Sequence, residues 1–442
     1  MLMESASQGA QVPAMDWQHQ IDAQAAGQVL AAAIRQGYTH DRDALLFHDL
    51  DQLSARIAEL RAAFPASTLH ALAIKSNPLV SLLRFAVERG MGLEAASLEE
   101  VALARAAGCP AARIVFDSPA KTRREIAQSL AWGITLNADN FDEIERIGAA
   151  VAAAAGRCDS MVGLRVNPQV GDGSIGMTSV AGAYSKFGVP LEQRREAIID
   201  AYRHYPWLRG LHLHVGSQGV TEQQLAAAVE KVFELRSQIH AALGEARIHC
   251  VDIGGGLSWR YREDSTVPTP RSYAAVLRAR VPLAFAPEVQ LITEYGRCVQ
   301  TGCGFAASRV EYVKTDGGRR TAVIHFGADL MMRRVYRPDD WYYRFSVLAP
   351  DGSPKQGAPV AHTIAGPLCF GGDLLARDLP LPQIEEGDWV IIHDTGGYTL
   401  SMWSRHCNRG LPTVLGYAGN PPEFSCLHAG ESPEDVVRFW NV

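Results

Sequence analysis

The chain has 442 residues, of which 47% are hydrophobic and 20% are charged, a composition typical of a globular protein and not of a disordered one. Its formal net charge of -6 gives no electrostatic reason to expect a nucleic-acid partner. No apolar run reaches the roughly 18 residues of a membrane span, and Met1–Ala6 lack the basic start of a secretory signal. We therefore expect a cytoplasmic protein without a membrane segment.

Eight cysteines are scattered along the chain without a Cys-x-x-Cys pair and without zinc-ligand spacing to histidine. We expect no metal site and mostly buried thiols. Cys369 is the exception for reasons given below.

The first elements precede the main repeat of the chain. Residues 1–43 are predicted to be a partly ordered leader with a short helix near 27–35. Ala44–Asp49 is predicted to be a strand, and residues 50–64 repeat apolar side chains at helical spacing.

From Leu72 onward, apolar runs alternate with Ala-, Leu-, Glu- and Arg-rich stretches of helical periodicity. Eight strand-helix units in a row favour a (β/α)8 barrel, whose catalytic groups sit at the carboxyl ends of the strands. After the first run, the others begin near Gly92, Ile114, Ile134, Val162, Leu211, Val251 and Leu291.

Polar residues and glycines end several of these runs. A lysine, a histidine, a glycine-rich turn, a glutamate and an arginine on one rim indicate a site for a phosphorylated, carbonyl-bearing cofactor. The residues at these ends are Lys75, Glu94, Arg165, Asn167, His214, Ser217, Gly254, Gly255, Gly256, Glu294 and Arg297.

The pattern changes after Arg297. Residues 310–314, 321–325 and 389–393 are β-type runs broken by Gly, Pro and Asp turns, and long helical patterns are absent. Only 402–406 and 434–440 suggest short helices. The fold class predicted is therefore α/β, a (β/α)8 barrel of the TIM type followed by a mainly-β domain.

Taken together and in this order, these motifs resemble the pyridoxal-phosphate-dependent decarboxylases of the alanine-racemase-like fold, the group of diaminopimelate and ornithine decarboxylases. The resemblance implies pyridoxal 5'-phosphate as cofactor and a homodimer with shared active sites. It also implies three parts: a leader over 1–43, a barrel over 44–299 whose first strand joins the β domain, and a β domain over 300–442. The matching segments are 73–77, 164–168, 185–188, 212–218, 252–257, 294–297, 366–369 and 396–398.

The resemblance assigns cofactor contacts to individual residues. Lys75 would form the Schiff base, for which a lysine amine is the suitable nucleophile. His214 would stack on the pyridine ring, while Glu94 and Arg165 would support the Lys75 end of the site. The phosphate would be bound by Ser217, Gly254, Gly255, Gly256, Gly296, Arg297 and Tyr398.

Glu294 and Cys369 decide the reaction class. A carboxylate beside the pyridine nitrogen keeps it protonated, which favours loss of CO2 through an external aldimine and a quinonoid. The related racemases have an arginine there. Cys369 would reprotonate the substrate from across the dimer interface. A racemase or epimerase and a non-catalytic regulator are the alternatives to a decarboxylase.

The substrate end departs from the family. The residue after the cysteine is acidic in decarboxylases of diaminopimelate and ornithine, but here it is Phe370, which cannot offset a buried ammonium. Arg333 and Tyr336 lie roughly where diaminopimelate decarboxylases bind a distal carboxylate. We expect an amino acid or amino acid conjugate with a polar or anionic tail. If a diamino acid were the substrate, Asp373 or Asp340 would have to reach its ammonium.

Overall fold

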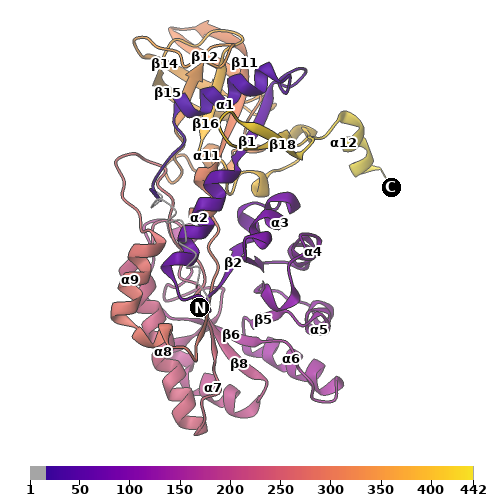
Figure 1. The fold of residues 1–442 in the computed structure, drawn as a ribbon, viewed down its shortest axis with the longest axis vertical. Helices are drawn as coiled ribbons and strands as arrows, with labels where there is room; N and C mark the ends of the chain where they lie inside the picture. The colour runs from indigo at the N-terminus through magenta and orange to yellow at the C-terminus, as the bar shows by residue number, and fades with distance from the viewer. Residues whose placement is uncertain (1–15, 442) are drawn as a thin grey trace, which may run out of the picture.

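The computed structural model describes residues 16–441 and places a barrel below a β-sheet region (Figure 1). The expected leader falls partly on residues 1–15, which lie outside the described residues, as does the segment considered for a secretory signal. Within the rest of the leader, α1 spans Ala23–Arg35, and the side chain of Asp22 accepts a hydrogen bond from Ala25 N at its start.

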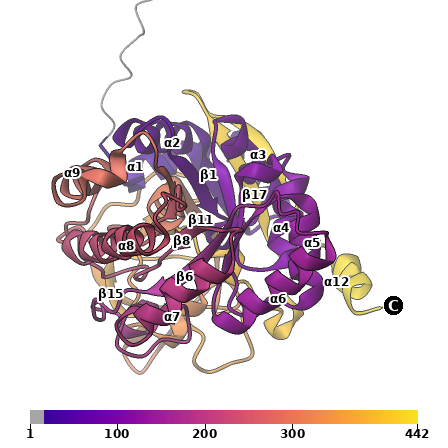
Figure 2. The same ribbon diagram turned by 90° about the horizontal axis from the view of Figure 1, so that it is seen from below.

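Eight parallel strands form a closed barrel, as predicted (Figure 2). The first and last strands pair with each other, and so do the fourth and fifth, so the barrel has no open edge. The strands are β2 (Leu69–Ala73), β3 (Gly92–Ala95), β4 (Ile114–Phe116), β5 (Thr135–Ala138), β6 (Val162–Asn167), β8 (Leu208–His212), β9 (Cys250–Asp252) and β10 (Gln290–Thr293). A two-residue strand, β7 (Val189–Pro190), pairs with the end of β6.

Helices surround the barrel, and all of those named below except α3 and α7 begin at a side-chain cap that the sequence supplies. Thr122 and Glu125 form a capping box at α5, and Thr221 and Gln224 form another at α8. Gly133 ends α5 in the left-handed conformation. The helices are α2 (Leu50–Ala63), α3 (Val80–Glu88), α4 (Leu98–Ala106), α5 (Arg123–Trp132), α6 (Phe141–Ala153), α7 (Leu191–His204), α8 (Glu222–Leu243) and α9 (Pro270–Arg280).

The second sheet has nine strands and includes the strand that precedes the barrel. β1 (Ala44–Asp49) pairs antiparallel with β11 (Gly304–Asp316) and parallel with β17 (Thr413–Ala418). We propose 299/300 as the boundary between the barrel and this region. The other strands are β12 (Arg319–Ile324), β13 (Phe345–Leu348), β14 (Val360–Ala365), β15 (Leu374–Leu381), β16 (Trp389–His393) and β18 (Glu423–His428).

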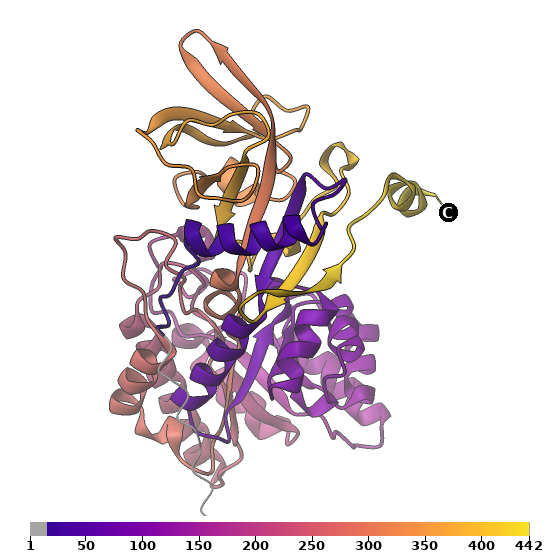
Figure 3. The same ribbon diagram turned by 45° about the horizontal axis from the view of Figure 1, so that its top comes forward.

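Three short helices accompany the second sheet. α10 (Arg297–Gln300) follows the last barrel strand, and α11 (Met332–Tyr336) lies between β12 and β13. α12 (Pro433–Trp440) lies at the edge of the molecule, away from the barrel (Figure 3). Among residues 16–441, no helix combines the length and the apolar character that crossing a bilayer requires.

Candidate active site

A cavity of about 400 Å³ lies at the carboxyl ends of the barrel strands, where the second sheet covers the barrel. It is lined by Lys75, Arg165, His214, Ser217, Gly256, Glu294, Gly296, Arg297, Arg333 and Tyr398, all of which the sequence singled out, and by Asp117, Trp341 and Met402, which it did not. A cavity of this size can enclose a ligand as large as a phosphorylated cofactor.

Backbone hydrogen bonds fix the second sheet to the barrel beside the cavity. Tyr398 N donates to Ser76 O at 2.7 Å, and the Asn77 side chain donates to Gly396 O at 3.0 Å. Ser76 and Asn77 directly follow Lys75. The lysine and the tyrosine are therefore held next to each other although they come from opposite ends of the chain.

Lys75 projects into the cavity from a short turn after β2, with 39% of its side chain exposed. Its Nζ donates to Glu94 Oε1 at 2.6 Å. Burial acts to lower the pKa of Lys75, but attraction to Glu94, Asp117 and Glu294 raises it above its ordinary value. The amine is held as a cation in this state, with Glu94 as its buried carboxylate partner.

Two arginines converge on one side of the cavity. Arg297 donates from Nη2 to Ser217 Oγ at 2.9 Å, and its guanidinium lies 4.2 Å from the centre of the Tyr398 ring. Arg333 donates from Nη2 to Tyr398 O at 3.0 Å and lies 4.1 Å from the Trp341 ring centre. Neither guanidinium forms an ion pair with a carboxylate of residues 16–441. Buried cations without a counter-ion indicate an anion-binding site.

The glycine turn after β9 brings the backbone close to the same place. Gly254 and Gly256 have φ values of +66° and +119°, which favour glycine. A Cβ at Gly254 would lie 2.5 Å from Leu213 O, and one at Gly255 would lie 2.6 Å from Glu294 O. A side chain is excluded here, so a phosphate can approach the backbone.

Glu294 is 4% exposed, and its Oε1 has no hydrogen-bond partner among the described residues. Burial, with repulsion from Asp117, raises the pKa of Glu294 to about 8. His214 lies beside it and accepts a hydrogen bond at Nδ1 from Gly255 N. Burial, with repulsion from Arg165 and Lys75, lowers the pKa of His214, so its imidazole is neutral.

These observations fit pyridoxal phosphate. The unpaired Arg297 and the glycine turn suit its phosphate, Lys75 suits its carbonyl, and the orphaned Glu294 oxygen suits its pyridine nitrogen. The same donor set would not suit a neutral cofactor, because the buried Arg297 charge would then have no counter-ion.

Several expected substrate residues lie outside this cavity. Cys369 and Phe370 are exposed, and the Phe370 ring stacks on Tyr336 with 5.9 Å between centres. Asp373 is buried at the end of the loop that carries Cys369 and Phe370, and its two oxygens accept hydrogen bonds from Ala328 N and Leu368 N. The structure therefore does not bring Asp373 into the cavity, and Asp340 pairs instead with Arg337.

The sequence reasoning missed several residues of the site. Asp117 directly follows β4, and the rule that singled out Lys75 and Glu94 would have found it. Trp341 lies in an irregular segment without a pattern. The cysteine expectation was wrong for two residues, since Cys407 and Cys426 are exposed as well as Cys369.

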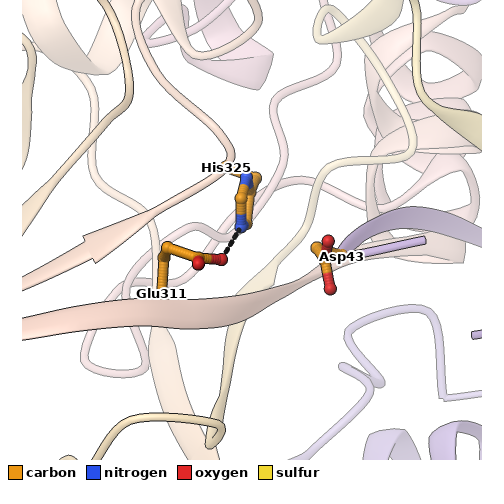
Figure 4. Close-up of side chains that lie close together, drawn as sticks. All are labelled: Asp43, Glu311 and His325. Atoms are coloured by element: carbon orange, nitrogen blue, oxygen red, sulfur yellow. Dashed lines mark hydrogen bonds and ion pairs between the residues drawn. The ribbon is translucent and has the colours of Figure 1, made fainter. Parts of the chain in front are cut away.

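One further group of acidic and imidazole side chains lies in the second sheet region (Figure 4). His325 Nε2 is 3.1 Å from Glu311 Oε2, and Asp43 Oδ1 accepts a hydrogen bond from Arg309 Nε at 3.1 Å. These contacts connect β11 to its neighbours, and the group is an exposed ion-pair network away from the cavity.

Known proteins resemble this chain in both sequence and fold. The family described as pyridoxal-dependent decarboxylase, pyridoxal binding domain, matches residues 50–301. Diaminopimelate decarboxylase of Zymomonas mobilis is 30% identical over 86% of this chain and 87% of its own length. The enzyme of the same name from Neisseria meningitidis is 32% identical over 84% and 88%.

Solved structures agree on the fold. Diaminopimelate decarboxylase from Helicobacter pylori, complexed with L-lysine, has a TM-score of 0.81 at 22% identity, covering 92% of this chain and 99% of its own. Lysine/ornithine decarboxylase from Vibrio vulnificus, complexed with putrescine, has a TM-score of 0.73 at 22% identity, covering 88% and 98%. The chain therefore belongs to the pyridoxal-dependent decarboxylases of the diaminopimelate and ornithine decarboxylase family, and it is a carboxy-lyase that acts on an amino acid.

Proposed function

We propose that this enzyme removes the α-carboxylate of an amino acid, or of an amino acid conjugate, whose distal end carries a polar or anionic group and no free ammonium. The observation that carries the proposal is Phe370, directly after Cys369, where the decarboxylases that the chain resembles have an acidic residue. The alternatives of a racemase or a non-catalytic regulator are disfavoured by the set of Lys75, Glu294 and Cys369.

The barrel residues would hold the cofactor. Lys75 is placed for its carbonyl, Ser217, Arg297 and Tyr398 with the glycine turn for its phosphate, His214 for one face of its ring and Glu294 for its pyridine nitrogen. When bound, pyridoxal phosphate supplies a covalent attachment and an electron sink for the charge left by CO2. With the cofactor bound, Glu294 would be ionised beside the protonated pyridine nitrogen.

The distal end of the substrate would meet Phe370 in place of a free carboxylate. Phe370 and Tyr336 offer two stacked rings, and both oxygens of the nearby Asp373 are occupied by backbone N–H groups. Arg333 lines the cavity, and its Nε and Nη1 have no partner among the described residues. A carboxylate or another anionic group at the substrate tail would satisfy these donors.

We also propose that the enzyme works as a homodimer in which each chain brings Cys369 and Phe370 to the cavity of its partner. Both residues are exposed, and neither lines the cavity of its own chain. In that position Cys369 Sγ would donate a proton to the substrate Cα after CO2 has left.

Subunit complementation tests this shared site. Lys75→Ala and Cys369→Ala homodimers should each be inactive or strongly impaired. Mixing the two after dissociation should restore roughly a quarter of wild-type activity, because half of the dimers are mixed and each has one intact site. No recovery, with mixed dimers confirmed by mass spectrometry, would rule out the shared site.

The eight cysteines form no disulfide among the described residues, which favours a reducing, cytoplasmic setting.

A CO2-release assay tests the reaction and the substrate class together. The panel should contain lysine, ornithine, meso-diaminopimelate and amino acid conjugates with carboxylate tails, with chiral analysis of each α-amino acid. CO2 release from a conjugate supports the proposal. Racemisation without CO2, or no turnover with the cofactor bound, supports the racemase or the regulator respectively.

A further inference from the structure

Three buried titratable side chains meet at the carboxyl ends of three barrel strands that are not adjacent to one another. His212 ends β8 and is fully buried, while Asp117 follows β4 and Glu294 follows β10. His212 Nε2 lies 3.6 Å from Asp117 Oδ2 and 3.6 Å from Glu294 Oε1. One imidazole nitrogen therefore faces two carboxyl groups.

The hydrogen bonds of this group are incomplete. Neither ring nitrogen of His212 has a partner among residues 16–441, and Glu294 Oε1 and Asp117 Oδ1 have none either. Buried polar atoms are rarely left unpaired in a folded protein. Four such atoms lie in this one group, and each can form a further hydrogen bond.

His214 cannot supply that proton to Glu294, although its Nδ1 is only 3.9 Å from Glu294 Oε2. The N–H of Gly255 donates to this Nδ1 at 3.1 Å, so the nitrogen is an acceptor and carries no proton. His212 is therefore the imidazole that is free to donate toward Glu294.

A metal ion is a poor alternative occupant. Arg165 Nη1 lies 3.7 Å from Asp117 Oδ2, and Lys75 is close enough for its charge to act on both carboxyl groups. Cations already facing these carboxylates oppose the binding of another.

We propose that His212 is a positioning residue that allows the Glu294 carboxyl to ionise, by holding a donor between Glu294 and Asp117. The proposal rests on the proposed function, in which an ionised Glu294 faces the pyridine nitrogen. Without the imidazole, two carboxylates would share a buried space, and one of them would retain a proton. The other titratable or charged groups near Glu294 are Lys75, Glu94, Arg165, His214 and Asp252.

The surroundings explain why Glu294 needs such support. Burial, with repulsion from Asp117, already raises the pKa of Glu294 to about 8. Burial, with repulsion from Glu294, also raises the pKa of Asp252, whose oxygens accept hydrogen bonds from Gly254 N and Asn137 Nδ2. Burial lowers the pKa of His212, so the imidazole is neutral before a ligand enters and can act as donor or acceptor.

Infrared titration of the apoprotein tests the proposal without cofactor. The C=O stretch of protonated Glu294, assigned by its loss in Glu294→Gln, is followed against pH. His212→Phe should move the midpoint up by about one pH unit or more, and His212→Gln, which keeps a donor, should move it less. Adding Asp117→Asn to His212→Phe should move the midpoint back down, because the repelling charge is gone.

A midpoint unchanged in His212→Phe, or one that Asp117→Asn does not lower, overturns the proposal. If His212→Phe fails to fold by circular dichroism, His212→Gln and Asp117→Asn still give opposite predicted shifts. A second arm titrates each apoprotein with pyridoxal phosphate by tryptophan fluorescence. His212→Phe should bind it roughly tenfold more weakly at neutral pH, with the deficit shrinking at higher pH.

The two readouts separate this proposal from the proposed function. If the infrared shifts occur but no amino acid is decarboxylated, the proposed function fails and the role of His212 stands. If decarboxylation is found but the infrared midpoint does not respond to His212, the role of His212 fails alone.

Discussion

The barrel end of the proposed site and its β-domain end are built differently. Glu94, Glu294 and Arg297 are at most 5% exposed, and neighbours in the same chain surround each of them. Phe370 is 36% exposed and Tyr336 is 52% exposed, and the Phe370 ring lies 5.9 Å from that of Tyr336 and 6.0 Å from that of His406. The side chains of the barrel end are therefore already held in place in the absence of substrate. We propose that the β-domain end sets the choice of substrate among enzymes that share one cofactor.

Lys75→Ala removes the only amine of residues 16–441 that lines the cavity and should have the largest effect. We expect decarboxylation to fall by roughly 10³-fold or more, because no other side chain can form the covalent attachment. Borohydride reduction followed by mass spectrometry should find no cofactor adduct. Lys314→Ala, an exposed lysine on β11, is the matched control and should keep both activity and adduct. An adduct retained in Lys75→Ala would contradict the assignment.

Glu294→Gln tests whether the barrel end supplies charge as well as shape. Glutamine preserves size but cannot carry a negative charge, so we expect cofactor binding with turnover reduced by roughly 10²-fold. Steady-state kinetics and the absorbance of the bound cofactor measure the two effects. Glu288→Gln, on the barrel surface, should change neither. Turnover near the wild-type value in Glu294→Gln would remove Glu294 from the chemistry.

Phe370→Glu tests whether the β-domain end sets the substrate. A carboxylate there should raise kcat/KM for at least one of lysine, ornithine and meso-diaminopimelate by roughly tenfold or more, since it supplies the partner for the distal ammonium. Cofactor affinity should not change. Phe370→Leu, without a charge, should give no such gain. Ordinary efficiency of the wild type on one of these amino acids would show that another residue pairs the ammonium.

The contribution of Glu294 to the stability of the apoprotein should fall as pH rises. Burial and Asp117 raise the pKa of Glu294 to about 8, so between its unfolded value and pH 8 the folded state binds more protons than the unfolded state. Its contribution therefore lowers the free energy of unfolding by at most about 1.4 kcal/mol per pH unit. Urea titrations from pH 5 to pH 8 should show that the free energy of unfolding of the wild type falls relative to that of Glu294→Gln as pH rises. Identical profiles would place the pKa of Glu294 near its ordinary value.

The site residues at the barrel end could be predicted from the sequence because the strand ends converge in this fold. Lys75, Glu94, His214 and Glu294 each lie at or just past a buried apolar run, and closure of the barrel brings them together. The expected start of β8 at Leu211 was three residues late, because Leu208 and Gly210 are separated by Arg209, which interrupts the apolar run.

The arrangement of the residues at the β-domain end could not be predicted in the same way. The position of Phe370 depends on a loop held by the buried Asp373, whose partners Ala328 and Leu368 are distant or irregular in sequence. Trp341 approaches Arg297 and Arg333 from a segment without helix or strand. Contacts of this kind arise from tertiary packing, and no local periodicity in the sequence predicts them.

The place of β1 between β11 and β17 has a consequence for synthesis on the ribosome. β1 emerges early, but its parallel partner β17 begins only at Thr413, after the entire barrel. At ordinary rates of translation the two are separated by roughly 20 to 70 seconds. During that time Ala44–Asp49 presents an unpaired edge, the kind of edge that recruits other chains. Overproduction should therefore be limited by aggregation of nascent chains, and slower translation should not relieve it.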